Sequence, residues 1–274
     1  MYKLIAIDLD GTLLKDDKTI TNVNKKTLRK AREVGVKVVL TSGRPIQGIE
    51  KYLDELGLTG KDDYVIGING AVICKSSDSS VVDTNAVLTG KDIKYIYNKI
   101  KNLDTYVHAF TSKEDLVNIE SKFSDAEEKR INLKVRRVDF LDEVQDEDEI
   151  LKLVLEEEKE ILDEITPQIP KELFEKYTVI RSLDFMIEFM NMNCNKATGL
   201  EKLAQHLGIN REEIMAIGDA DNDKEMLEYA GLGVAMGNAK DEIKQLADFV
   251  TKSNEEDGVA YVIDKFILNP IKRD

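Results

Sequence analysis

Short apolar runs alternate with helix-forming segments toward both ends of the chain, and this alternation restricts the possible folds more than any other feature. In the first part of the chain, the expected strands are residues 3–9, 36–40 and 64–68. The helices between them are predicted over residues 22–34, ending at Gly35, and from Pro45 to about Gly57. Strands and helices that alternate in this order build right-handed βαβ units, so the pattern predicts a parallel sheet.

The C-terminal part shows the same alternation of expected strands and helices. Helices are predicted over residues 196–206 and 223–229, and strands over residues 214–217 and 232–236. Both parts together predict an α/β fold with a doubly wound (Rossmann-like) parallel-sheet core. In such a core the ligand crevice lies at the carboxyl ends of the strands.

The middle of the chain differs from its flanks. From about residue 84 to residue 188, charged amphipathic stretches alternate with short β-like runs, and no low-complexity linker separates them from either side. We therefore expect residues 84–188 to form an inserted α/β domain, joined by two hinges to a core made of residues 1–83 and 189–274.

Charge and cysteine content exclude several classes of protein. The 274 residues include 39 Lys and Arg against 53 Asp and Glu, which gives a net charge of −14. Nucleic-acid binding is not expected, because neutralising phosphates requires clustered basic residues. No apolar run approaches the roughly 18 residues of a membrane span. Two cysteines form no disulfide framework or zinc-ligand set, so we expect a cytoplasmic protein.

The first chemical motif, Asp8-Leu-Asp10-Gly11-Thr12, stands where a buried strand is expected to end. On an extended chain the two aspartates point to the same side, about 6.6 Å apart. One carboxylate can then attack a phosphorus atom while the other handles the proton of the leaving oxygen. Gly11 allows a sharp turn after them.

A second acidic motif, which runs from Gly218 to Asp223, also follows an apolar strand. Neither motif has the glycine and glutamate that an EF-hand loop requires at its sixth and twelfth positions. Acidic residues gathered at a strand end are costly unless a cation offsets them. A Mg²⁺ site built from both motifs explains the two together.

Two further features favour an anion beside that metal. Hydroxyl and backbone N–H groups of Thr41-Ser42-Gly43-Arg44 stand before an expected helix, although Ser42 could equally be a simple helix cap. Lys196 begins another helix and would, in isolation, read as a surface residue. With Asp10 protonated, three aspartates would contribute −3 against +2 from Mg²⁺ and +1 from Lys196, which permits a phosphate dianion.

The order of these motifs resembles the haloacid dehalogenase-like (HAD) superfamily, and more narrowly the Cof-type, YidA-like sugar phosphatases. The resemblance covers nearly the whole chain. Its most specific segments begin at Asp8, Thr41, Gly218 and Gly233: Asp-Leu-Asp-Gly-Thr-Leu, Thr-Ser-Gly-Arg-Pro, Gly-Asp-Ala-Asp-Asn-Asp and Gly-Val-Ala-Met-Gly-Asn-Ala. It implies a Mg²⁺-dependent phosphatase of small phosphorylated metabolites, with the inserted domain as a type IIB cap.

The resemblance also implies a role for each matching residue. Asp8 would be the nucleophile and Asp10 the acid and base. Mg²⁺ would be bound by Asp8, the main-chain carbonyl of Asp10 and Asp219, with Asp223 supporting or joining the metal shell. The phosphate-binding residues would be Leu9, Ser42, Gly43, Lys196 and Asn222, and Arg44 would touch the substrate.

Two other functions remain open from the residues themselves. A phosphomutase would use the same chemistry but return the phosphoryl group to another hydroxyl. A phospho-aspartate signalling module also uses Mg²⁺ and an aspartate, although it explains neither Lys196 nor the inserted domain. Multiple turnover on a small phosphate ester would exclude the signalling module.

Overall fold

A computed structural model of the chain describes residues 1–120, 122 and 134–269, and it divides into two compact units. The first consists of Met1–Asn85 and Asn195–Asp274, and the second is Ala86–Cys194. The second boundary therefore lies later than the hinge expected near residue 188. The reason is strand β13 (Met186–Asn191), which pairs on both sides with strands of the second unit.

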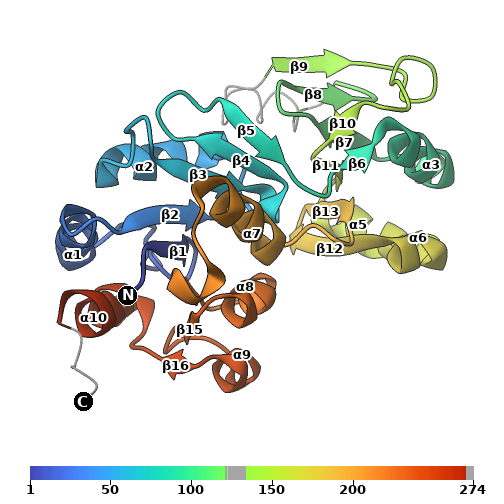
Figure 1. The fold of residues 1–274 in the computed structure, drawn as a ribbon. Coiled ribbons are helices and arrows are strands. Elements are labelled where there is room, and N and C mark those ends of the chain that lie inside the picture. The colour runs from blue at the N-terminus through green and yellow to red at the C-terminus, as the bar shows by residue number, and fades with distance from the viewer. Residues whose placement is uncertain (121, 123–133, 270–274) are drawn as a thin grey trace. The chain divides into compact units, whose positions relative to one another are not determined.

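The first unit is built on one eight-stranded sheet in the order β16-β15-β14-β1-β2-β3-β4-β5. The strands are β1 (Leu4–Asp8), β2 (Lys37–Thr41), β3 (Tyr64–Gly67), β4 (Val72–Lys75), β5 (Val81–Thr84), β14 (Ile214–Gly218), β15 (Leu232–Ala235) and β16 (Phe249–Val250). Figure 1 shows the blue N-terminal strands beside the orange C-terminal strands in this sheet. Six strands, from β16 to β3, run parallel, as the alternating pattern predicts. The remaining two are an antiparallel addition at one edge.

Helices cover both faces of this sheet, as a doubly wound fold requires. They are α1 (Asn22–Glu33), α2 (Glu50–Leu56), α7 (Lys196–Leu207), α8 (Lys224–Tyr229), α9 (Asp241–Leu246) and α10 (Gly258–Ile263). Leu4 and Ala6 of β1 share a buried core with residues of α7, α8 and α9. Ile5 and Ile7 alternate to the opposite face and are equally buried. These apolar strands therefore hold their carboxyl ends in fixed register.

The second unit has a six-stranded sheet in the order β12-β13-β11-β7-β8-β9 and a two-stranded sheet of β10 and β6. Besides β13, its strands are β6 (Leu88–Thr89), β7 (Tyr106–Phe110), β8 (Glu114–Val117), β9 (Lys134–Arg137), β10 (Glu149–Ile150), β11 (Lys152–Glu156) and β12 (Tyr177–Leu183). Its helices are α3 (Gly90–Ile100), α5 (Lys159–Ile165) and α6 (Lys171–Lys176).

The two faces of the six-stranded sheet differ in chemistry. One face packs against the helices through a continuous apolar core that includes Val107, Leu153 and Phe189. The other carries buried ionisable groups, with Lys152 bonded to Glu188 at 2.7 Å. His108, on this face, is a fully buried residue whose Nδ1 lies 2.8 Å from Asp115.

Among the described residues, no helix is long and apolar enough to cross a membrane.

Candidate active site

The site lies where three neighbouring parallel strands of the core sheet end. Asp8, the last residue of β1, is in register with Thr41, the last residue of β2. On the other side of β1, the pairing with β14 brings Gly218 to the same edge. The register of the sheet therefore places the first acidic motif between the Ser42 loop and the second acidic motif.

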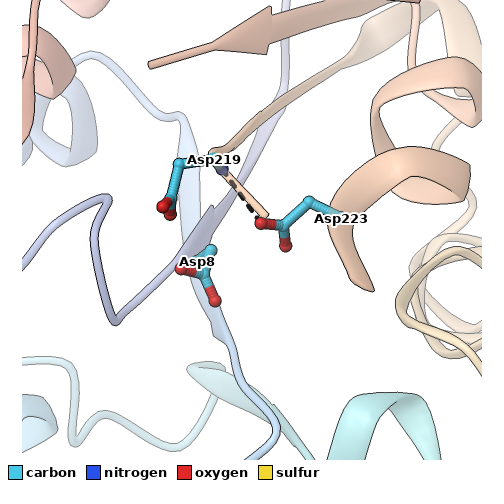
Figure 2. Close-up of side chains that lie close together, drawn as sticks. All are labelled: Asp8, Asp219 and Asp223. Atoms are coloured by element: carbon cyan, nitrogen blue, oxygen red, sulfur yellow. Dashed lines mark hydrogen bonds between the residues drawn. The ribbon is translucent and has the colours of Figure 1, made fainter. Parts of the chain in front are cut away.

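Three carboxylates meet at this edge. Asp8, Asp219 and Asp223 each offer an oxygen, and these oxygens all lie within 4.8 Å of one another. Figure 2 shows the three side chains together, with the backbone N–H of Asp219 donating to the Asp223 carboxylate at 3.0 Å. The part of the chain that the structure describes contains no other such group of three potential ligands.

Gly11 allows the two acidic loops to approach so closely. Its φ of +81° lies in the left-handed region, which residues with a side chain adopt at a cost. A Cβ at this position would lie 2.4 Å from Oδ2 of Asp219. The Thr12 hydroxyl then donates to Oδ1 of Asp219 at 2.7 Å and fixes that carboxylate. Thr12 belongs to the first motif, but its residue type and position alone do not reveal this contact.

Lys196, the first residue of α7, supplies the positive charge of the cluster. Its Nζ donates to Oδ1 of Asp8 at 2.5 Å and to Oδ1 of Asp223 at 2.6 Å. The side chain is fully buried. Burial by itself would lower the pKa of Lys196, but Asp223 and Asp8 outweigh it and raise that pKa, so the ammonium stays charged. The structure thus brings Lys196 to the reacting edge, away from the surface position that a lone lysine suggests.

The negative charge of the three carboxylates exceeds the positive charge that Lys196 supplies. Burial, only partly offset by Lys196, raises the pKa of Asp8 to about 8. Burial likewise raises the pKa of Asp219 to about 6, against the hydrogen bond from Thr12. When ionised, the three aspartates contribute −3 and Lys196 contributes +1, which leaves −2. A divalent cation fits this deficit and this all-oxygen set of ligands.

Asp10 is held on the more open side of the site by two cations. Arg44 forms a fork, with Nε 2.7 Å from Oδ2 and Nη2 2.7 Å from Oδ1 of Asp10. Lys18 donates to the same Oδ1 at 2.8 Å. Burial of Asp10 opposes ionisation, but hydrogen bonds from Arg44 and Lys18 prevail and lower its pKa. Asp10 is therefore ionised here, unlike in the charge count that gave it a proton.

The expected phosphate-binding residues surround the same edge. Ser42 is buried, and its Oγ accepts from the backbone N–H of Arg44 at 3.2 Å. Asn222 is exposed and donates to Oδ1 of Asn69 at 2.9 Å. Leu9 has a fully buried side chain, so only its backbone is available to a phosphoryl group.

Sequence reasoning missed Lys18, because nothing in its local pattern separates it from the other lysines. The pair Asn69-Gly70 is typical of a hairpin turn, and Asn69 does lie in the turn between β3 and β4. Its side chain also contacts Asn222, a relation across 153 positions that no local pattern reveals.

Comparison with known proteins settles the family. A model described as haloacid dehalogenase-like hydrolase matches residues 5–263. The chain belongs to the haloacid dehalogenase-like hydrolases. It is 40% identical over 276 residues to YxeH of Bacillus subtilis, which covers 98% of this chain and 99% of that protein.

Other members of the HAD family define its activity and its second unit. The chain is 34% identical over 277 residues to YitU of Bacillus subtilis, named as a 5-amino-6-(5-phospho-D-ribitylamino)uracil phosphatase, over 96% of this chain and 97% of that one. A solved HAD subclass IIB sugar phosphatase has the same fold, with a TM-score of 0.73 and 24% identity over 96% of this chain and 98% of that one. This HAD protein is therefore a phosphoric monoester hydrolase, and its second unit is a type IIB cap.

Proposed function

We propose that this phosphatase hydrolyses phosphomonoesters of small metabolites, sugar or polyol phosphates among them, through an aspartyl-phosphate on Asp8, and that it depends on Mg²⁺. One observation carries the proposal. Asp8 stands at the end of a buried strand, between a charged lysine and two further carboxylates. A nucleophilic carboxylate beside charge that can neutralise phosphoryl oxygens is what phosphoryl transfer requires.

In the first half of the reaction, an Asp8 oxygen attacks phosphorus, and the bond between phosphorus and the ester oxygen breaks. The departing alkoxide takes a proton from Asp10. Because Arg44 and Lys18 keep Asp10 ionised in the free site, we expect it to take up this proton from solvent once a bound ester oxygen replaces one of these cations.

In the second half, Asp10 accepts a proton from water. The water oxygen attacks phosphorus, which releases inorganic phosphate and restores the Asp8 carboxylate. Lys196 stays in place and compensates charge on the phosphoryl oxygens, while Ser42, Gly43 and Asn222 bind the group.

Asp8, Asp219 and Asp223, with the main-chain carbonyl of Asp10, would hold the metal. When bound, Mg²⁺ would neutralise charge on the phosphoryl group and on the carboxylates. The deficit of −2 in the cluster supports a divalent ion at this position.

The substrate class follows from charge and from relatives. A net charge of −14 disfavours polyanionic partners such as nucleic acid, which leaves small phosphorylated metabolites. The substrate in the name of YitU carries its phosphate on a ribityl chain, a polyol ester. We assign the choice among such leaving groups to the cap, and we place the protein in the cytoplasm, where its two free buried cysteines fit a reducing environment.

The test is a phosphate-release screen over sugar and polyol phosphates, with Mg²⁺ and with EDTA. Asp8→Asn should abolish release while circular dichroism stays unchanged. Asp54→Asn, on the exposed side of α2, is the matched control and should behave as wild type. Substantial turnover by Asp8→Asn would refute the nucleophile, and full activity in EDTA would refute the metal. An isomeric sugar phosphate in place of free phosphate would show a phosphomutase.

A further inference from the structure

The turn between β3 and β4 has an unusual backbone. Ile68, Asn69 and Gly70 are consecutive and all left-handed, with φ of 50°, 51° and 99°. For a β-branched residue such as Ile68 this conformation is costly, so the surroundings must impose it. Two backbone bonds do so: Ile68 N–H donates to the carbonyl of Arg44 at 3.0 Å, and Asn69 N–H donates to that of Ser42 at 2.9 Å.

Asn69 thereby reaches two phosphate-binding segments. Its side chain is buried at 8% exposure, and its Oδ1 accepts from Nδ2 of Asn222 at 2.9 Å. The same Oδ1 lies 3.0 Å from the place that a Cβ on Gly43 would occupy. The amide of Asn69 therefore fills the space between the loop after β2 and the loop after β14.

The next residue contacts the third phosphate-binding segment. A Cβ on Gly70 would lie 2.1 Å from the carbonyl oxygen of Asn195, the residue before Lys196. A Cβ on Gly199, one turn into α7, would lie 2.7 Å from the Cα of Gly70. The turn is thus in direct contact with the start of α7, where Lys196 is held.

We propose that Asn69 is a positioning residue around the transferring phosphoryl group: its side chain fixes Asn222, and its backbone N–H fixes the Ser42–Gly43 loop. This inference rests on the proposed function. Asn222 is otherwise exposed, and its amide has two N–H donors. One is used on Asn69, which orients the other for a phosphoryl oxygen.

The residue type matches this role. Asparagine adopts the left-handed backbone more readily than most residues, and its amide oxygen accepts from Asn222 without adding charge. An aspartate would accept the same hydrogen bond, but it would set a negative charge beside a phosphate dianion. Charge and hydrogen bonding can therefore be tested separately at this position.

The experiment compares Asn69→Gly, Asn69→Asp, Asn222→Ala and the double variant Asn69→Gly/Asn222→Ala. Glycine keeps the left-handed backbone and removes only the side chain. Asn69→Gly should lower kcat/KM by about 2–10-fold, the effect of one hydrogen bond. The double variant should be no worse than Asn222→Ala, because Asn69 acts through Asn222. Asn69→Asp should raise KM, and the inhibition constant of inorganic phosphate, more than it lowers kcat.

Asp104→Gly is the matched control, because Asp104 is left-handed, with φ of 51°, exposed and part of the cap. It should leave the kinetic constants unchanged. Multiplicative losses in the double variant, or an Asn69→Asp variant with wild-type KM and phosphate inhibition, would overturn the positioning role. If wild type released no phosphate from any ester, the proposed function would fail instead. Calorimetric titration of wild type and of Asn69→Asp with inorganic phosphate, in the presence of Mg²⁺, would then test the role of Asn69. Weaker binding by Asn69→Asp is expected, and equal binding would contradict the role.

Discussion

Replacing Lys196 by methionine should lower the free energy of unfolding, mainly at high pH. The substitution keeps the length of the side chain but removes the charge that lies 2.5 Å from Asp8 and 2.6 Å from Asp223. Removing one partner of a buried ion pair costs about 3–5 kcal/mol, because the other charge stays buried without compensation.

The loss can be converted to an unfolding temperature. The core unit comprises residues 1–85 and 195–274, 165 residues in all. For domains of about this size, 1 kcal/mol shifts the midpoint by roughly 2–4 °C, so we expect a decrease of roughly 6–20 °C at pH 8 without metal. At pH 5 the decrease should be smaller, because Asp8, whose pKa is raised to about 8, is then protonated.

The assay is thermal unfolding followed by circular dichroism in EDTA, at pH 5 and pH 8. Lys202→Met, on the same helix, is the control, because its side chain is 38% exposed and pairs with Asp83 at 3.3 Å. Such a surface pair contributes about 0.2–1 kcal/mol, so its midpoint should fall by no more than about 4 °C. If Lys196→Met unfolded at the same temperature as wild type at pH 8, or if its unfolding temperature fell as much at pH 5 as at pH 8, the buried charge balance described above would be wrong.

Four further predictions concern the same site. In EDTA, stability should fall as pH rises from about 4 to about 8, because the folded chain binds the protons of Asp8 and Asp219 more tightly than the unfolded chain; denaturant titrations that instead show rising stability would contradict this. Mg²⁺ should stabilise the protein more at pH 8 than at pH 5, since it competes with those protons, and a calorimetric affinity independent of pH would speak against the cluster as its ligands. Arg44→Gln should raise the pKa of Asp10, so the limb of the kcat–pH profile that Asp10 controls should move to higher pH, and an unmoved limb would show that Arg44 does not act on this carboxyl. Gly11→Ala should cost roughly 1–3 kcal/mol and most of the activity, because its left-handed backbone and the nearby Asp219 leave no room for a Cβ; a variant with wild-type unfolding and turnover would refute that reading.

The strand-end geometry was predictable from the sequence for a physical reason. Alternating apolar strands and helices produce a parallel sheet, and parallel strands end at one edge. Asp8 and Asp219 were each placed at the end of an apolar strand, and their carboxylates do lie together in the structure. Of the antiparallel strands β4 and β5, the sequence indicates only the turn before β4, through the pair Asn69-Gly70.

Other parts of the site could not be predicted from the local sequence. The burial of Lys196 depends on α7 packing against loops that lie far away in sequence, so in isolation this lysine resembles a surface residue. Arg44 was placed beside the phosphate loop, yet its fork onto Asp10 is a side-chain contact that sequence spacing does not determine. The second hinge was expected inside β13, because a short strand of mixed polarity reads the same in either unit.

The most direct test of the mechanism is to find the phosphoryl group on the protein. Wild type is mixed with an ester that carries a radiolabelled phosphoryl group, quenched in acid within one turnover and digested for peptide mapping. We expect base-labile label on the peptide that contains Asp8, and none on Asp8→Asn. Label on another residue, or release of labelled phosphate with no labelled protein at any time, would contradict the account.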